Sequence, residues 1–320
     1  MSEPQHIPPI APPETPATRS GTLADNAKGG VLAALAAYGL WGFLPILFRM
    51  LDGVPSTLIV AERILWSLVL VGVFLLIKRR LGEVIAVLRD RRRLLYVTVA
   101  ALVLACNWLL YVWAVETEQL LEASFGYFIN PLVNVALGMV LLGERQNRWQ
   151  AVSIAIAVVG IGIQAAGLGN IPFIALGLAL SFGLYGFFRK TAGVGATIGL
   201  FAETLVMAPI ALVFVVVFTA LHGTGPHADP QTFILLMLTG PATAVPLLLF
   251  AYAVQRLRLT TIGMFQYIAP SIQFLVAILM FGEALNEVRL ISFALIWISL
   301  AVFTVDSVRQ RRRRSSSAAA

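Results

Sequence analysis

Long apolar runs alternate with short polar segments along the chain from residue 29 onward. Ten of these runs are each close to the roughly 20 residues that an α-helix needs to cross the hydrocarbon core of a bilayer. We predict one membrane-spanning helix for each run. The runs lie near residues 29–50, 56–78, 94–115, 120–142, 149–167, 171–188, 196–220, 231–254, 259–281 and 288–307.

Two of the predicted helices carry the same pattern. Residues 122–144 read EASFGYFINPLVNVALGMVLLGE, and residues 261–283 read TIGMFQYIAPSIQFLVAILMFGE. In both segments an Ile stands two residues before a Pro, and a Gly-Glu pair follows at the same distance from that Pro. Such a match indicates a duplicated unit. Because Gly commonly ends a helix, we expect the Gly-Glu pairs to cap these helices and close the loops after them.

The duplication extends over most of the chain. Predicted helices 1 to 4 resemble helices 6 to 9 in order, whereas the match of the fifth helix to the tenth is too weak to decide. Five helices per unit is an odd number, so the two units must lie in opposite orientations in the membrane, as in many secondary transporters. The further matching segments are 37–43 with 181–187, Ala61-Glu62 with Ala202-Glu203, and 109–116 with 248–255.

These patterns predict an all-α integral membrane protein with ten transmembrane helices in two inverted five-helix repeats. The repeats are expected over residues 28–168 and 169–308. Residues 1–27 hold six prolines among small and polar residues, so we expect a disordered tail there. Residues 309–320 are expected to form a basic tail that attracts anionic membrane lipid.

Composition and charge agree with a membrane protein. Hydrophobic residues make up 59% of the chain, charged residues 12%, and the mean hydropathy is +0.86. A net charge of +7 could suit nucleic acid, but 20 of the 23 Lys and Arg residues fall in the segments on one side of the predicted helices. That asymmetry is a topology signal, which predicts that both termini are cytoplasmic and gives no reason to expect nucleic-acid binding.

The two repeated prolines are predicted to interrupt their helices. Pro131 would free the carbonyl of Tyr127, and Pro270 that of Gln266. A backbone group freed inside a membrane needs a neighbouring helix or a water-filled cavity to satisfy it. We therefore expect both helices to line a cavity.

Polar and aromatic side chains at membrane depth are candidates for the wall of that cavity. Amides recur on one face of the fourth helix, and the ninth helix offers amides at comparable spacing. The alternative is that these groups only hold helices together. Aromatic rings with polar tips suit a flat or amphipathic organic molecule. The predicted substrate-binding residues are Tyr38, Trp41, Asn107, Trp108, Tyr111, Tyr127, Asn130, Asn134, Tyr185, Gln266, Tyr267 and Gln273.

Three charged residues lie inside apolar runs. They are Glu62, Arg63 and Glu203, and charges at membrane depth are by default a functional hypothesis. With inverted repeats, Glu62 lies nearer the outer face and Glu203 nearer the inner, so we predict pseudo-symmetric gates or proton-coupling sites. The alternative is a structural role, in which Glu62 snorkels or pairs with Arg63.

The sequence offers little for metal, cofactor or enzyme chemistry. Cys106 is the single cysteine, and the three histidines show no ligand spacing. Neither an ATP-binding loop nor a catalytic triad is evident. We expect no metal, no cofactor and no enzymatic activity, and a solute or proton gradient as the energy source.

Several motifs resemble those of the RarD-type permeases, which belong to the EamA family of the drug/metabolite transporter superfamily. They span nearly the whole membrane region. The resemblance implies a multi-pass permease of the bacterial cytoplasmic membrane that moves a metabolite or a chloramphenicol-like drug. The motifs are residues 35–49, 107–115, 121–145, 171–190 and 256–270.

Taken together, the residues predict a secondary transporter in which two five-helix repeats rock around a central cavity and expose it alternately to either side. The alternative is a non-transporting membrane sensor or assembly protein. Interruptions in both repeats favour transport, because a purely structural bundle has little need of them.

Overall fold

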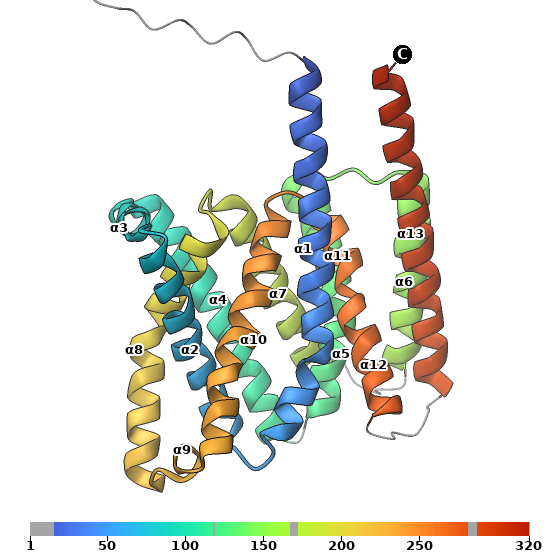
Figure 1. Ribbon diagram of the computed structural model, residues 1–320. Coiled ribbons are helices and arrows are strands. Elements are labelled where there is room, and N and C mark those ends of the chain that lie inside the picture. Colours follow the sequence, from blue (N-terminus) through green and yellow to red (C-terminus); the bar gives the residue numbers. More distant parts are fainter. Residues whose placement is uncertain (1–15, 118, 167–171, 281–286, 320) are drawn as a thin grey trace, which may run out of the picture.

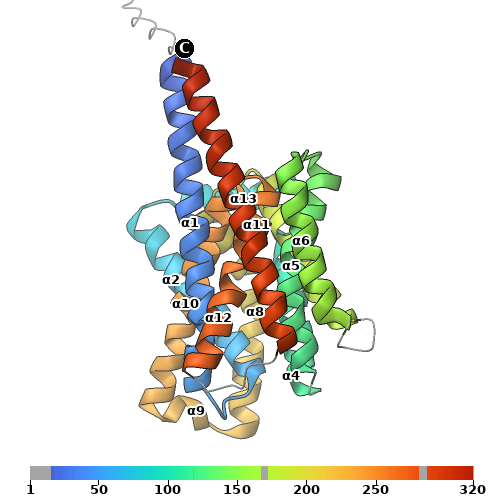
Figure 2. The ribbon, with the colours of Figure 1, turned by 90° about the vertical axis from the view of Figure 1, so that its right-hand side faces the viewer.

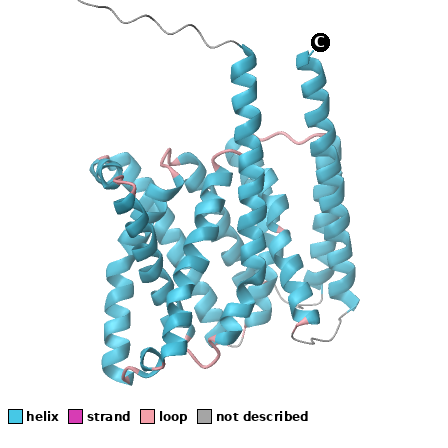
Figure 3. Ribbon diagram, in the orientation of Figure 1, coloured by secondary structure: helices cyan, strands magenta, loops and turns pink. Residues whose placement is uncertain are grey.

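The computed structural model describes residues 16–117, 119–166, 172–280 and 287–319. Every regular element in these ranges is a helix (Figure 3). The helices are α1 (Pro16–Met50), α2 (Ser56–Ile77), α3 (Leu81–Arg89), α4 (Arg91–Glu116), α5 (Leu120–Leu142), α6 (Arg148–Ala166), α7 (Phe173–Thr191), α8 (Ala196–His222), α9 (Gly225–Ala228), α10 (Pro230–Val254), α11 (Leu259–Gln266), α12 (Ile268–Leu279) and α13 (Glu287–Ala319).

Within the described residues, ten helical segments are long and apolar enough to cross a membrane, which confirms the ten predicted runs. The ninth of these spans, Leu259–Val276, is made of α11 and part of α12. Large apolar side chains such as Val140 and Leu221 are three-quarters or more exposed, as expected for faces that lie against lipid chains. The short helices α3 and α9 were not predicted.

Both described ends of the chain lie on the same side of the bundle. In Figures 1 and 2, α1 begins and α13 ends beyond the other helices, at the top of the view. Helix α1 already begins at Pro16, so the disordered tail predicted for residues 1–27 is helical from that residue onward. A proline fits the first turn of a helix, and no other proline follows until Pro45, so the transmembrane helix can extend outward.

The two halves of the chain are interleaved, with most of the close helix pairs formed between halves. Helix α1 packs against α10, and the equivalent pair is α7 with α4. Likewise α5 packs against α7 as α12 does against α1, and α2 packs against α10 as α8 does against α4. Pairs that exchange in this way are related by a pseudo-two-fold axis, the relation that inverted repeats require.

Helices α6 and α13 pack against each other through a reciprocal contact. The Ser153 hydroxyl donates to the carbonyl of Ser299 at 2.8 Å, and the Ser299 hydroxyl donates to the carbonyl of Ser153 at 2.7 Å. Such an exchange is what two equivalent residues make across a two-fold axis. It supports the correspondence of the fifth span to the tenth, which the sequence left open.

The two repeated prolines behave differently. The predicted break at Pro131 is wrong, because α5 runs unbroken from Leu120 to Leu142. A proline removes only one helical hydrogen bond, and α5 is supported along its length by α7 and α11. In the second repeat the helix is interrupted at Tyr267, between α11 and α12 and three residues before Pro270.

Candidate functional site

A cavity of about 140 Å³ lies between helices of both repeats. On α1 its wall runs from Tyr38 to Phe48, that is, from the middle of the helix toward the side away from the termini. The structure brings nine predicted residues together on the wall. They are Tyr38, Trp41, Asn107, Trp108, Tyr111, Tyr127, Asn130, Gln266 and Gln273.

Three other predicted residues are absent from this wall, each for a local reason. Asn134 is fully buried and donates its amide to Gln266 Oε1 at 2.6 Å, across α5 and α11. Tyr185 donates its hydroxyl to Glu203 at 3.1 Å and stacks on Phe250. Tyr267 packs into an apolar cluster that includes Phe128. These side chains support the wall from behind.

Arg63 also lines the cavity. It lies seven residues after Ser56, so about 10 Å into α2 at 1.5 Å per residue. Its Nε donates to Thr243 Oγ1 at 2.7 Å, and its guanidinium carbon lies 5.1 Å from the ring centre of Trp108 and 5.4 Å from that of Phe48. An arginine at membrane depth costs about 3 kcal/mol on insertion scales. Ring faces and one hydroxyl offset part of that cost.

Some polar atoms of the wall lack partners. The Asn130 amide oxygen and the Tyr38 hydroxyl are buried, and neither has a hydrogen-bond partner in the part of the chain that the structure describes. A buried polar group without a partner costs about 1–3 kcal/mol.

The other amides of the wall are anchored to neighbouring helices. The amide nitrogen of Asn107 donates to the carbonyl of Leu178 and to Ser181 Oγ, both at 2.9 Å. That of Gln273 donates to the carbonyl of Trp41 at 3.1 Å. These bonds tie α4 to α7 and α12 to α1, so the wall is held in shape by contacts between the two repeats.

Glu62 points away from Arg63 and contacts a histidine instead. Its carboxylate lies 2.8 Å from Nε2 of His227, on the short helix α9 at the end of the bundle opposite the termini (Figure 1). The alternative of an ion pair between Glu62 and Arg63 is therefore not what the structure shows. Adjacent residues of a helix project in different directions, so one can face α9 while the other faces the cavity.

Glu203 forms a buried ion pair nearer the terminus side. Its carboxylate accepts from Arg189 Nη1 at 3.0 Å and from the Tyr185 hydroxyl, and Arg189 also donates to the carbonyl of Ala196. Glu203 and Arg189 are both about 1% exposed. Gly199 makes room for this pair, because a Cβ there would lie 1.8 Å from Arg189 Nη1.

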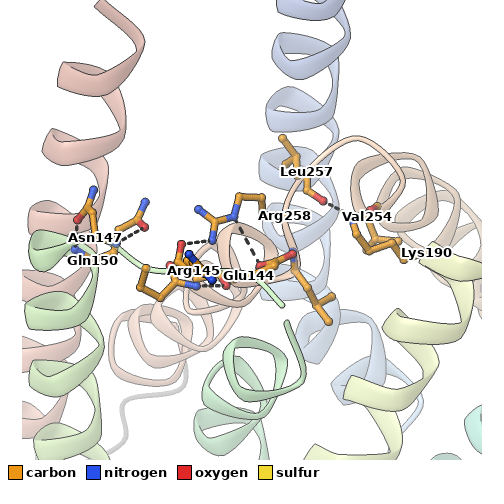
Figure 4. A network of polar contacts seen from close by, with 11 residues as sticks. Glu144, Arg145, Asn147, Gln150, Lys190, Val254, Leu257 and Arg258 are labelled. Carbon is orange, nitrogen blue, oxygen red and sulfur yellow. Dashed lines mark hydrogen bonds and ion pairs between the residues drawn. The ribbon is translucent and has the colours of Figure 1, made fainter. Parts of the chain in front are cut away.

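The loops on the terminus side are tied together by further polar contacts (Figure 4). Gly143, at φ +62°, ends α5 in the left-handed conformation. The Glu144 carboxylate then accepts from the backbone nitrogens of Leu259 at 2.7 Å and Thr260 at 3.0 Å, which caps α11. This contact agrees with the predicted capping role of the first Gly-Glu pair. The second pair, Gly282-Glu283, lies outside the described residues.

A second tie on the same side joins α7 to the loop before α11. The Lys190 ammonium donates to the carbonyl of Val254 at 2.8 Å and to that of Leu257 (Figure 4). Lys190 thereby satisfies carbonyls at the end of α10, which have no partner within the helix.

Sequence reasoning missed several functional neighbours. Thr243 anchors Arg63, and Phe48 adds a ring to the aromatic wall. His227 and Arg189, the partners of the two buried glutamates, were also missed. Phe182 also lines the cavity, at the position that corresponds to Tyr38 in the repeated segment. Thr243 had no usable signal, because a threonine in an apolar run is unremarkable by itself.

Comparison with known proteins gives the family. Residues 28–164 match the model of the EamA-like transporter family. An "Uncharacterized transporter" of Vibrio cholerae is 41% identical over 89% of this chain and 94% of its own length. "Protein RarD" of Escherichia coli K12 is 39% identical over 91% of this chain and 99% of its own length.

A solved structure titled "Crystal structure of protein" superposes with a TM-score of 0.68, at 19% identity, over 88% of this chain and 99% of its own. At that identity the likeness shows the fold alone. Identity near 40% over nearly the whole length of the named relatives shows the family as well as the fold. The chain is a multi-pass membrane protein and belongs to the EamA-like transporter family, as a RarD-type permease.

Proposed function

We propose that this transporter moves a small organic solute across the bacterial cytoplasmic membrane by alternating access, with both termini in the cytoplasm. The observation that carries the proposal is the cavity, which both repeats line and whose wall includes Arg63 and several amide side chains. Inverted-repeat transporters bind their substrates at such a position, near the bilayer midplane between the repeats. We expect no enzymatic activity.

Three polar contacts are candidates for the gates. The Glu203–Arg189 pair and the Glu144 cap lie between the cavity and the terminus side, and the Glu62–His227 contact lies on the other side. In this proposal the structure represents a state closed toward the cytoplasm. Opening toward the cytoplasm would separate the contacts near Glu203 while the Glu62–His227 contact stays formed, and opening toward the other side would separate Glu62 from His227. Proton coupling through either glutamate belongs to the same proposal.

The bodies that move differ from those expected from the sequence. Helices of the two repeats pack mainly against each other, so one repeat cannot rock against the other as a rigid unit without breaking most of these contacts. We therefore propose that the moving bodies are mixed bundles, each made of helices from both halves.

Relatives give only a weak indication of the substrate. A protein of Pseudomonas aeruginosa that is 30% identical over 89% of this chain is named "Chloramphenicol-sensitive protein RarD". In the conformation described, the cavity of 140 Å³ is comparable to an engineered cavity of about 150 Å³ that holds benzene. A small metabolite fits this space, and a drug of chloramphenicol size would need a wider state.

The proposal is tested by uptake and efflux of labelled compounds in proteoliposomes, with and without an imposed proton gradient. The panel includes chloramphenicol, amino acids and small organic acids. We expect transport of at least one compound, and its loss in Asn130→Ala. If correctly folded protein moves none of them, the sensor or assembly interpretation replaces transport. If transport is equal with and without the gradient, proton coupling is excluded.

A further inference from the structure

The described wall of the cavity carries a positive charge. Arg63 is the only charged side chain among the described residues that line it, and no described carboxylate lies within ion-pair distance of the guanidinium. Its neighbour Glu62 is held by His227. A positive charge therefore faces the cavity without a protein anion to balance it.

The guanidinium is also held so that it can bind a ligand. Its Nε–H is used by Thr243, and the rings of Trp108 and Phe48 fix its position. No hydrogen bond of the two terminal Nη groups is found within the described part of the chain. Two adjacent N–H groups in a fixed plane match the two oxygens of a carboxylate, which is the geometry that favours Arg over Lys.

The rest of the wall suits an acid with an apolar body. Asn107, Asn130 and Gln273 contribute amide groups to the wall, and Trp41 and Phe182 contribute aromatic rings. The described wall has no Asp or Glu to receive an ammonium group. A cation would be repelled by Arg63, and a zwitterion would leave its positive end unpaired.

We propose that the cavity binds a small organic monoanion, a soluble carboxylate with an apolar or aromatic body, through bidentate contact with Arg63. This assignment deepens the proposed transport function and rests on it. Benzoate is a suitable probe, since its ring is the size of ligand that a cavity of this volume holds.

The test compares ligands that share one ring and differ in charge. Benzoate, benzamide and benzylamine are titrated against the purified protein in phosphatidylcholine nanodiscs, and binding is followed by the fluorescence of Trp41 and Trp108, which line the cavity. We expect benzoate to bind about tenfold more tightly than benzamide, and benzylamine more weakly still. Equal binding of benzoate and benzamide by the wild-type protein would overturn the proposal, whether or not any variant folds.

Variants assign the preference to Arg63. Arg63→Gln should bind benzoate and benzamide equally, and Arg63→Lys should recover part of the difference as a point charge without the fork. Arg148→Gln, at an exposed position on the terminus side, is the matched control and should keep the wild-type preference. A preference that survives in folded Arg63→Gln protein would also overturn the proposal.

Two further measurements separate related outcomes. Titration in nanodiscs with added phosphatidylglycerol distinguishes a soluble carboxylate from a lipid headgroup, because displacement of benzoate by anionic lipid would make the cavity a lipid site and overturn the assignment. Transport of labelled benzoate separates this inference from the transport proposal. Benzoate that binds but does not move supports the site and contradicts alternating access. Transport of benzamide without binding of benzoate would support alternating access and contradict the carboxylate site.

Discussion

Glu62 and Glu203 occupy equivalent positions in the two repeats, yet they have partners of different chemistry. His227 carries a charge only when protonated, whereas Arg189 is permanently charged. The contact on the terminus side is therefore a full ion pair at every pH at which Glu203 is ionised. The contact on the opposite side depends on the protonation of an imidazole.

Replacing Arg189 should destabilise the protein strongly. Arg189→Ala leaves the Glu203 carboxylate buried with only the Tyr185 hydroxyl, and breaking a buried pair in this way costs about 3–5 kcal/mol. Thermal unfolding in detergent, followed by intrinsic fluorescence, measures the effect. Arg148→Ala removes an exposed arginine on the same side and should unfold near the wild-type temperature. If the two variants unfold alike, Glu203 does not depend on Arg189.

For single residues, the sequence predicts which side chains lie deep in the membrane, but not all of their partners. Asn107 and Asn130 were predicted to line a cavity, and both lie on its wall. The contact of Arg63 with Thr243 was not predicted, because Thr243 stands 180 residues away and nothing in the local pattern of either helix indicates that they meet. Adjacency in sequence suggested Glu62, which faces another element.

Helices α5 and α11 approach each other closely at Gly263. A Cβ at Gly263 would lie 2.5 Å from the carbonyl oxygen of Pro131 and 3.2 Å from the Cβ of Asn134. Backbone atoms cannot yield as a flexible side chain can. Gly263 therefore sets the spacing of the two helices that carry the Asn134–Gln266 hydrogen bond.

Gly263→Ala should force these helices apart and cost about 1–3 kcal/mol of stability, as overpacking does. We also expect weaker ligand binding, because Gln266 moves with α11. Gly162→Ala is the matched control, since a Cβ there meets no atom within 4 Å and alanine is the better helix former. The two variants are compared by thermal unfolding and by titration with the probes above. A Gly263→Ala protein as stable as the control would contradict this account of the crossing.

The ten spans could be read from hydropathy because each apolar run is long enough to cross a membrane. The helix interruption could not be read in the same way. Proline predicts a lost hydrogen bond at both Pro131 and Pro270, but whether the helix breaks there depends on what packs against it. Helix α5 is continuous beside α7 and α11, while the second copy is interrupted at Tyr267.

Over the whole molecule, the basic residues gather on the side of the termini, and their loops predict that this side is cytoplasmic. Cysteine labelling tests the orientation. The natural Cys106 is exposed and would be replaced first, by Cys106→Ser. Gly82→Cys and Gly225→Cys then add one thiol on each side, at positions where a Cβ meets no atom within 4 Å.

A membrane-impermeant maleimide added to intact cells should label Gly225→Cys at once and Gly82→Cys only after the membrane is permeabilised. Labelling of both proteins in permeabilised cells is the control for reactivity. The reverse pattern in intact cells would place the termini outside and invert the proposed gates.

The interleaving of the two halves has a consequence for how the protein is made. Arg63 is synthesised 180 residues before Thr243, and at about 5–20 residues per second the ribosome needs roughly ten to forty seconds to cover that distance. During this interval the first five helices are in the membrane while the partners of Arg63 and Asn134 do not yet exist. We therefore expect the insertion machinery or a membrane chaperone to keep these polar side chains of the first half away from lipid until the second half is inserted.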